Sequence, residues 1–89
     1  MGGADMRAQD VSDYLAGLDT HLAAIPELEA RLRVLDAERA RVERIERDVA
    51  AWAEKGKGES PSRFSAWDLG ILDGELTIRI QRERDKVST

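Results

Sequence analysis

The side chains able to perform acid–base or metal chemistry are few and widely spaced. His21 is the one histidine of the sequence, and there is no cysteine to supply a thiolate ligand or a disulfide. A histidine-based metal site or proton relay needs partner groups at a fixed spacing, and none surrounds His21, which we expect to pack at the edge of a helix seam. Asp10 and Asp13 are better suited to complementing a helix N-terminus than to binding metal. We therefore expect no catalytic residue, no metal and no cofactor, so the chain is not expected to be an enzyme.

Two tryptophans could bind a ligand by shape. Trp52 and Trp67 lie near the two ends of a connecting segment and could stack on a planar molecule, although large apolar residues in such places more often close the turn. The connecting segment 55–63 reads KGKGESPSR. Its lysines stand between glycines, but the spacing of a phosphate-binding loop and the strand before it are missing. We expect a flexible helix-to-helix connection over residues 56–64.

The charges of the chain are balanced and interleaved. There are 14 basic and 18 acidic side chains, and acidic residues alternate with the arginines of segment 31–47. Such a face is typical of a solvated, salt-bridged helix, and it supplies no net positive field for a phosphate backbone. We expect no direct binding to nucleic acid.

The elements that must position these side chains are helices. Charged residues make up 36% of the chain and aromatic residues 4%, a composition typical of long helices. Pro26 interrupts an apolar repeat with steps of three and four, so we predict a short helix over about 10–24 and a long one over about 26–55 with Pro26 in its first turn. Residues 1–9 precede the repeat and are expected to be disordered. The repeat itself comprises Val11, Tyr14, Leu18, His21, Ile25, Leu28, Leu32, Leu35, Val42 and Val49.

The segment from Trp67 to Gln81 allows two readings. Asp73-Gly74 could turn a β-hairpin with a self-consistent register, but nothing else in the chain reads as a strand that would cover its apolar face. The helical alternative begins with Ser65 as a cap and Asp68 three residues later, and Glu75 precedes Arg79 by four. We predict a helix over about 65–86, with the hairpin as the alternative.

As a helix, this last segment has two apolar faces separated by a strip of small residues. Two glycines within a helix cost about 1 kcal/mol each relative to alanine, so Gly70 and Gly74 suggest close approach of a neighbouring helix. Such a helix has more apolar surface than one small chain readily covers, and an exposed patch favours association. The predicted dimer interface comprises Trp67, Leu69, Gly70, Ile71, Leu72, Gly74, Leu76, Ile78 and Ile80.

The fold class that follows is all-α: a short helix, a long helix and an antiparallel final helix forming a coiled-coil-like helical hairpin, dimeric, in a single domain over residues 10–87. No apolar run reaches the roughly 18 residues of a membrane span, and no signal-like start is present. We expect no membrane association and a cytoplasmic location.

This arrangement resembles the C-terminal domain of PadR-like transcriptional regulators. The resemblance lies in Asp13-Tyr-Leu-Ala-Gly-Leu18, in the repeat from Leu28 to Ile45, and in Gly70-Ile71 followed by Glu75-Leu76. In that family the domain mediates homodimerisation, and small aromatic ligands can bind near its junction with a winged helix. If the resemblance holds, we expect these 89 residues to correspond to the dimerisation half alone, without that DNA-reading domain. The resemblance implies a homodimerisation module, able to sense a ligand and to contact a regulatory partner; the alternative is a stand-alone coiled-coil adaptor or scaffold that binds another protein.

Overall fold

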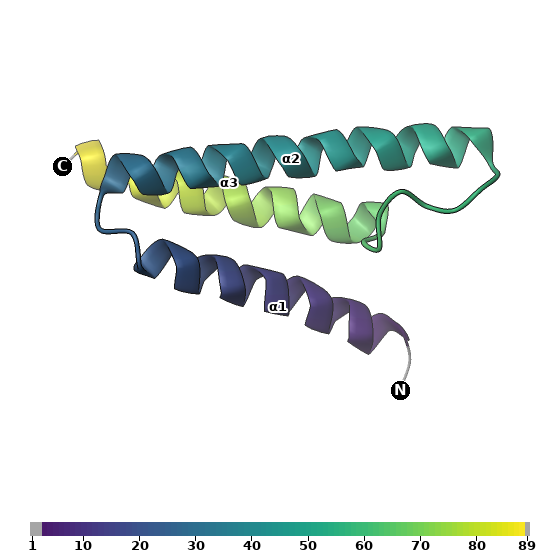
Figure 1. The fold of residues 1–89 in the computed structure, drawn as a ribbon, viewed down its shortest axis with the longest axis horizontal. Helices are drawn as coiled ribbons and strands as arrows, with labels where there is room; N and C mark the ends of the chain where they lie inside the picture. Colours follow the sequence, from purple (N-terminus) through teal and green to yellow (C-terminus); the bar gives the residue numbers. More distant parts are fainter. Residues whose placement is uncertain (1–2, 89) are drawn as a thin grey trace.

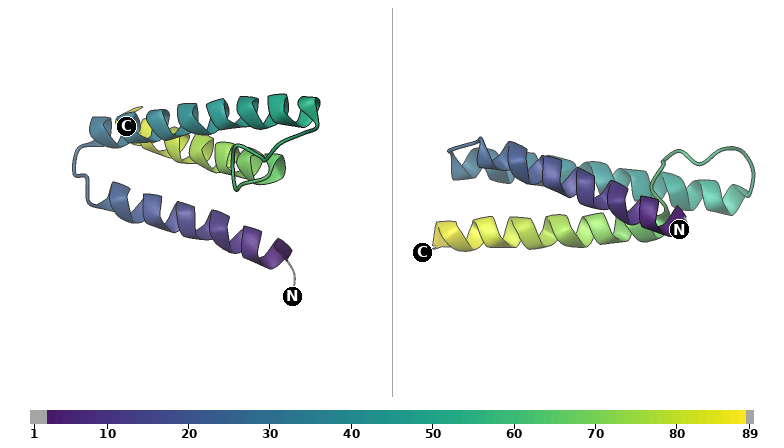
Figure 2. Two further views of the ribbon diagram at one scale, coloured as in Figure 1. Left: turned by 45° about the vertical axis from the view of Figure 1, so that its right-hand side comes forward. Right: turned by 90° about the horizontal axis from the view of Figure 1, so that it is seen from below.

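The structure, a computed structural model, describes residues 3–88, and the side chains of residues 10–86. It contains three helices in the order α1 (Gly3–Ala23), α2 (Leu28–Lys55) and α3 (Ala66–Ser88), and no strand among the described residues. In Figure 1, α2 and α3 run antiparallel beside each other, and α1 lies along one side of this pair. Figure 2 confirms the arrangement from two further directions. The predicted all-α hairpin is confirmed, and the β-hairpin alternative is wrong.

Residues close in sequence to each boundary explain where α1 and α2 begin. α1 starts at Gly3 rather than near Asp10, so residues 3–9 are helical where we expected disorder; residues 1–2 lie outside the described part. The apolar repeat starts only at Val11, but the Ala, Met, Arg and Gln residues that precede it have high helix propensity. Pro26 lies before α2 rather than in its first turn, because Glu27 is the extended cap residue, with φ −88° and ψ 127°.

Both helices are capped where they meet the connection between α2 and α3. Gly56 ends α2 in the left-handed conformation, with φ 68°, and its N–H donates to the Trp52 carbonyl at 3.1 Å. α3 begins with a reciprocal cap, as predicted: the Asp68 N–H donates to Ser65 Oγ at 3.2 Å, and the Ser65 N–H donates to Asp68 Oδ2 at 3.3 Å. These bonds satisfy Asp68, which is buried.

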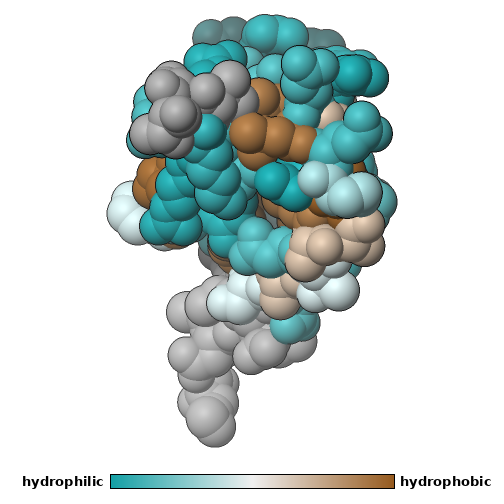
Figure 3. Space-filling model, turned by 90° about the vertical axis from the view of Figure 1, so that its left-hand side faces the viewer, coloured by the Kyte–Doolittle hydropathy of each residue, from teal (hydrophilic) through white to brown (hydrophobic). Residues whose placement is uncertain are grey.

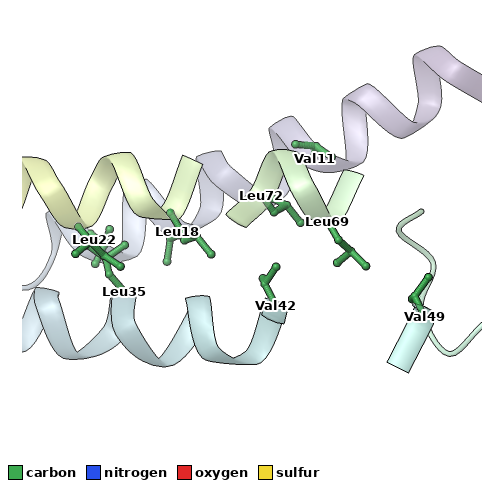
Figure 4. Close-up of a cluster of buried hydrophobic side chains, with 10 residues drawn as sticks. Val11, Leu18, Leu22, Leu35, Val42, Val49, Leu69 and Leu72 are labelled. Atoms are coloured by element: carbon green, nitrogen blue, oxygen red, sulfur yellow. The ribbon is translucent and has the colours of Figure 1, made fainter. Parts of the chain in front are cut away.

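The core lies between α2 and α3 and is completed by α1. The largest fully buried side chains are one residue of α2, Leu35, and four of α3. Figure 4 shows side chains from all three helices gathered into this cluster. Tyr14 of α1 adds an edge-on contact to the Phe64 ring, and its hydroxyl donates to Glu38 of α2. Burial and then the Glu38 hydrogen bond raise the pKa of Tyr14 above its ordinary range. The four buried residues of α3 are Leu69, Leu72, Leu76 and Ile80.

Candidate interaction face

The side of α3 that faces away from α1 and α2 carries bulky apolar residues in the open. Trp67 is 76% exposed, Ile71 39% and Ile78 46%. Gly70 and Gly74 lie beside them, and a Cβ built at either glycine would meet no atom within 4 Å. No helix of this chain therefore approaches the glycine strip closely. These five predicted interface residues form one continuous exposed surface, which we call the open face of α3.

The other four predicted interface residues lie elsewhere. Leu69, Leu72, Leu76 and Ile80 are at most 2% exposed in the single chain, where they form its core. They cannot contact a second copy while this core is intact. A sequence pattern with two apolar faces does not say which face the chain covers itself, and the structure assigns that role to these four.

The open face is uncharged along its central part. Between Ala66 and Ile78 the exposed positions hold only small, apolar or hydroxyl side chains, whereas the charged residues of this stretch are buried or half-buried. An uncharged surface with Trp67 at one end is unusual in a chain with 36% charged residues. The exposed residues are Ala66, Trp67, Gly70, Ile71, Gly74, Thr77 and Ile78.

A groove runs between α2 and α3 along one edge of the open face. Its floor is apolar and built from small residues of both helices, and its volume is about 560 Å³. Arg47 and three carboxyl groups line its rim. Burial first, then the neighbouring carboxyls of Asp73 and Glu43, raise the pKa of Glu46. The floor comprises Val49, Ala50, Ala53 and Ala66.

A second cleft, of about 700 Å³, lies where the end of α1 meets α3 and the start of α2. Arg79 donates to both carboxylate oxygens of Asp19, at 2.8 and 2.9 Å, and to Glu75 at 2.7 Å, which confirms the pairing predicted between Glu75 and Arg79. Arg31 donates to Glu83 at 2.8 Å. Figure 3 views this end and shows apolar surface surrounded by polar side chains.

These ion pairs hold the three helices together. The hydrogen bond from Arg79 lowers the pKa of Asp19. Burial opposes the ionisation of Glu83, but hydrogen bonds from Arg31 and Lys86 lower its pKa nonetheless. Three of the cations that line the cleft, Arg31, Arg79 and Lys86, already have carboxylate partners, and we assign the cleft to helix packing rather than to ligand binding.

The remaining predicted residues do not assemble into a site. Trp52 is half-buried, and its indole N–H donates to the Gly58 carbonyl at 2.9 Å, which is the turn-closing role. His21 is exposed in the last turn of α1, not packed at the seam, because Leu22 takes the buried position. Asp10 and Asp13 lie well inside α1 because that helix starts at Gly3, so they do not complement its N-terminus.

Neither a metal site nor a membrane span is found in the part of the chain that the structure describes. Within it, no three histidine or carboxylate side chains come together as a metal site would require. No helix within residues 3–88 is both long and apolar enough to cross a bilayer.

Sequence reasoning missed the groove and both long-range ion pairs. Arg79 and Asp19 are separated by 60 residues, and Arg31 and Glu83 by 52. No local spacing could have indicated these pairs. The groove is marked in the sequence only by the small size of Ala50 and Ala53 near the end of a charged helix.

In comparisons with known proteins, no family model, no curated protein and no solved structure matches this chain.

Proposed function

We propose that this chain is a homodimerisation module, and that two copies associate through the open face of α3. The observation that carries the proposal is that the exposed positions between Ala66 and Ile78 carry no charged residue, and that three of them hold bulky apolar side chains although the chain's own core is complete. Contiguous apolar surface of this kind marks interaction sites on small proteins. A small domain also gains stability from burying surface against a second chain.

The wider role we propose is that of the C-terminal dimerisation domain of a PadR-like transcriptional regulator. The support is the order of α1, the long helix α2 and the apolar final helix α3, together with the motifs quoted from the sequence. In this proposal the chain contributes self-association, and reading of DNA belongs to another domain. Self-association itself does not depend on the family resemblance and is tested separately.

Sedimentation equilibrium of the purified chain tests self-association. We expect a dimer at concentrations of about tens of micromolar, which corresponds to roughly −6 to −7 kcal/mol of association free energy. Ile78→Asp places an unpaired charge on the open face and should weaken the dimer by about tenfold or more, because that charge must be desolvated on association. Ala37→Asp adds the same charge on the exposed surface of α2 and should leave the association unchanged.

Two results would contradict the proposal. A wild-type chain that stays monomeric over this concentration range would favour the adaptor alternative, in which α3 binds a different protein. A dimer that is equally insensitive to Ile78→Asp and to Ala37→Asp would place the self-interface on another surface.

A further inference from the structure

The open face of α3 and the groove beside it together form two unlike edges and a middle strip. At about 100° per residue, Trp67, Ile71 and Ile78 lie along one edge and the two glycines along the middle. Ala66 and Asp73 lie along the other edge, where both line the groove with α2. One edge therefore protrudes and the other is hollow.

The Trp67 edge and the groove match in size and in chemistry, and they lie at the same position along the axis of α3. The groove lies between the levels of Ala66 and Asp73 along α3, and Trp67 stands at the same level on the opposite edge. Its floor of alanine and valine suits an apolar ring. The carboxyl groups of Glu46 and Asp73 at its rim are acceptors for the donor that an indole N–H supplies.

The symmetry of a dimer decides which edges meet. A two-fold axis parallel to α3 exchanges the left and right edges of the second copy, so each protruding edge lies against the other copy's groove at its own level. A two-fold axis perpendicular to α3 makes the helices antiparallel and places each edge of one copy against the same edge of the other. It would bring Trp67 edges against each other and leave both grooves empty.

We propose that the two copies pack with their α3 helices parallel, so that Trp67 of each copy occupies the α2–α3 groove of the other. This inference rests on the proposed homodimer and adds the direction in which the copies face. The closest approach falls at Gly70 and Gly74, where the absence of side chains lets two helix backbones come together. Small residues four apart serve this purpose in pairs of transmembrane helices, and the steric reason is the same here.

Charge supports the same orientation. Beyond the apolar stretch, Arg84 falls on the groove edge and Asp85 on the Trp67 edge, by the same helical spacing. Parallel packing brings Arg84 of one copy opposite Asp85 of the other, twice over. The perpendicular axis would not bring these opposite charges together.

The groove contacts also supply the area that a dimer requires. A helix face about 20 Å long and about 10 Å wide, taken alone, falls short of the roughly 1,200 Å² that specific interfaces bury in total. Each inserted tryptophan buries about 150–250 Å², and the groove wall loses a similar area. Two such insertions bring the total to about 1,000–1,400 Å², which reaches the lower limit for a specific dimer.

Disulfide cross-linking tests the orientation directly, because the chain contains no cysteine. Ala50→Cys places a thiol in the groove, and Ile71→Cys places one on the Trp67 edge. A mixture of the two single-cysteine proteins, oxidised after equilibration, should yield predominantly the mixed disulfide. Ala37→Cys, on the far surface of α2, replaces Ala50→Cys in the control mixture and should give none.

The outcomes separate the orientation from the existence of a dimer. Predominant self-linking of Ile71→Cys would show that like edges meet, and it would overturn the parallel arrangement while leaving the homodimer intact. A dimer by sedimentation in which no mixed disulfide forms would overturn it as well. A wild-type monomer would overturn both the orientation and the proposed function.

Filling the groove provides an independent measurement. Ala53→Trp places a ring where the second copy's Trp67 should lie, and we expect it to weaken the dimer by about tenfold or more. Ala37→Trp is the matched control and should not change the dissociation constant. An Ala53→Trp protein that remains folded by circular dichroism and dimerises as well as the wild type would show that Trp67 does not occupy the groove.

Discussion

The two glycines of α3 have opposite expected effects on folding and on association. Gly74 lies inside a helix with open space around the position of its missing Cβ. Alanine there should stabilise the single chain by about 0.5–1 kcal/mol, because it reduces the conformational freedom of the unfolded chain without a clash. In a domain of this size the melting temperature should rise by about 2–8 °C. In the dimer, the added methyl groups stand at the closest approach of two helices and should weaken association.

Thermal unfolding and sedimentation equilibrium measure the two effects. Melting is followed by circular dichroism at low protein concentration, where the monomer dominates, and the dissociation constant is measured separately. Gly17→Ala is the matched control, since Gly17 is an exposed glycine inside α1 with equally open surroundings. It should raise the melting temperature by a similar amount without changing association. If Gly74→Ala destabilises the monomer, or strengthens the dimer, our account of the glycine strip is wrong.

Three further changes probe the interior of the single chain. Leu76→Ala removes a fully buried side chain and should lower the free energy of unfolding by about 2–5 kcal/mol in urea titration, whatever the protein concentration. Arg79→Met removes both hydrogen bonds to Asp19 and should speed hydrogen exchange in α1 more than in α2. Glu46→Gln should stabilise the chain at neutral pH, since the pKa of Glu46 is raised in the folded state, so its ionisation opposes folding.

The controls follow from the same contacts. The free energy of unfolding of the wild type, relative to that of Glu46→Gln, should increase as the pH falls through the raised pKa of Glu46. The difference between the two proteins should become constant below the pKa of an unfolded glutamate. If Glu46→Gln is more stable than the wild type by the same amount at pH 7 and at pH 3, the assignment is wrong. Arg44→Met, on the exposed surface of α2, should leave exchange in α1 unchanged. A Leu76→Ala protein as stable as the wild type would place the core elsewhere.

Stability at acid pH should follow the ion pairs. The lowered pKa values of Asp19 and Glu83 mean that both carboxylates favour the folded state above the pKa of the unfolded groups, and that this contribution is lost as the pH falls through the lowered values. Both groups are paired with arginines that join different helices. The acid side of the stability profile therefore reports the packing of α1 and α2 against the end of α3.

The helices were predictable because their signals are local. The repeat of apolar residues, the cap at Ser65 and the break at Pro26 each act within a few residues. The start of α1 was missed because the residues before Val11 lie outside the apolar repeat, and a repeat of apolar residues does not detect helix propensity. The partition of α3 into core and open face depends on where α1 and α2 come to lie, and that is set by contacts between residues far apart in the chain.

α3 has two apolar faces, and the core of the single chain is complete although only one of these faces is covered. α2 covers the leucine face of α3, and α1 is held to a neighbouring side through Arg79 and Asp19. These two helices leave the third side of α3 uncovered, and the exposed positions of that side between Ala66 and Ile78 carry no charge and include Gly70 and Gly74. Inside the chain the glycines serve no contact, since nothing lies within 4 Å of their missing Cβ atoms. The helix-forming cost of both glycines therefore has no compensation within the single chain, and the proposed parallel packing of a second α3 would supply one.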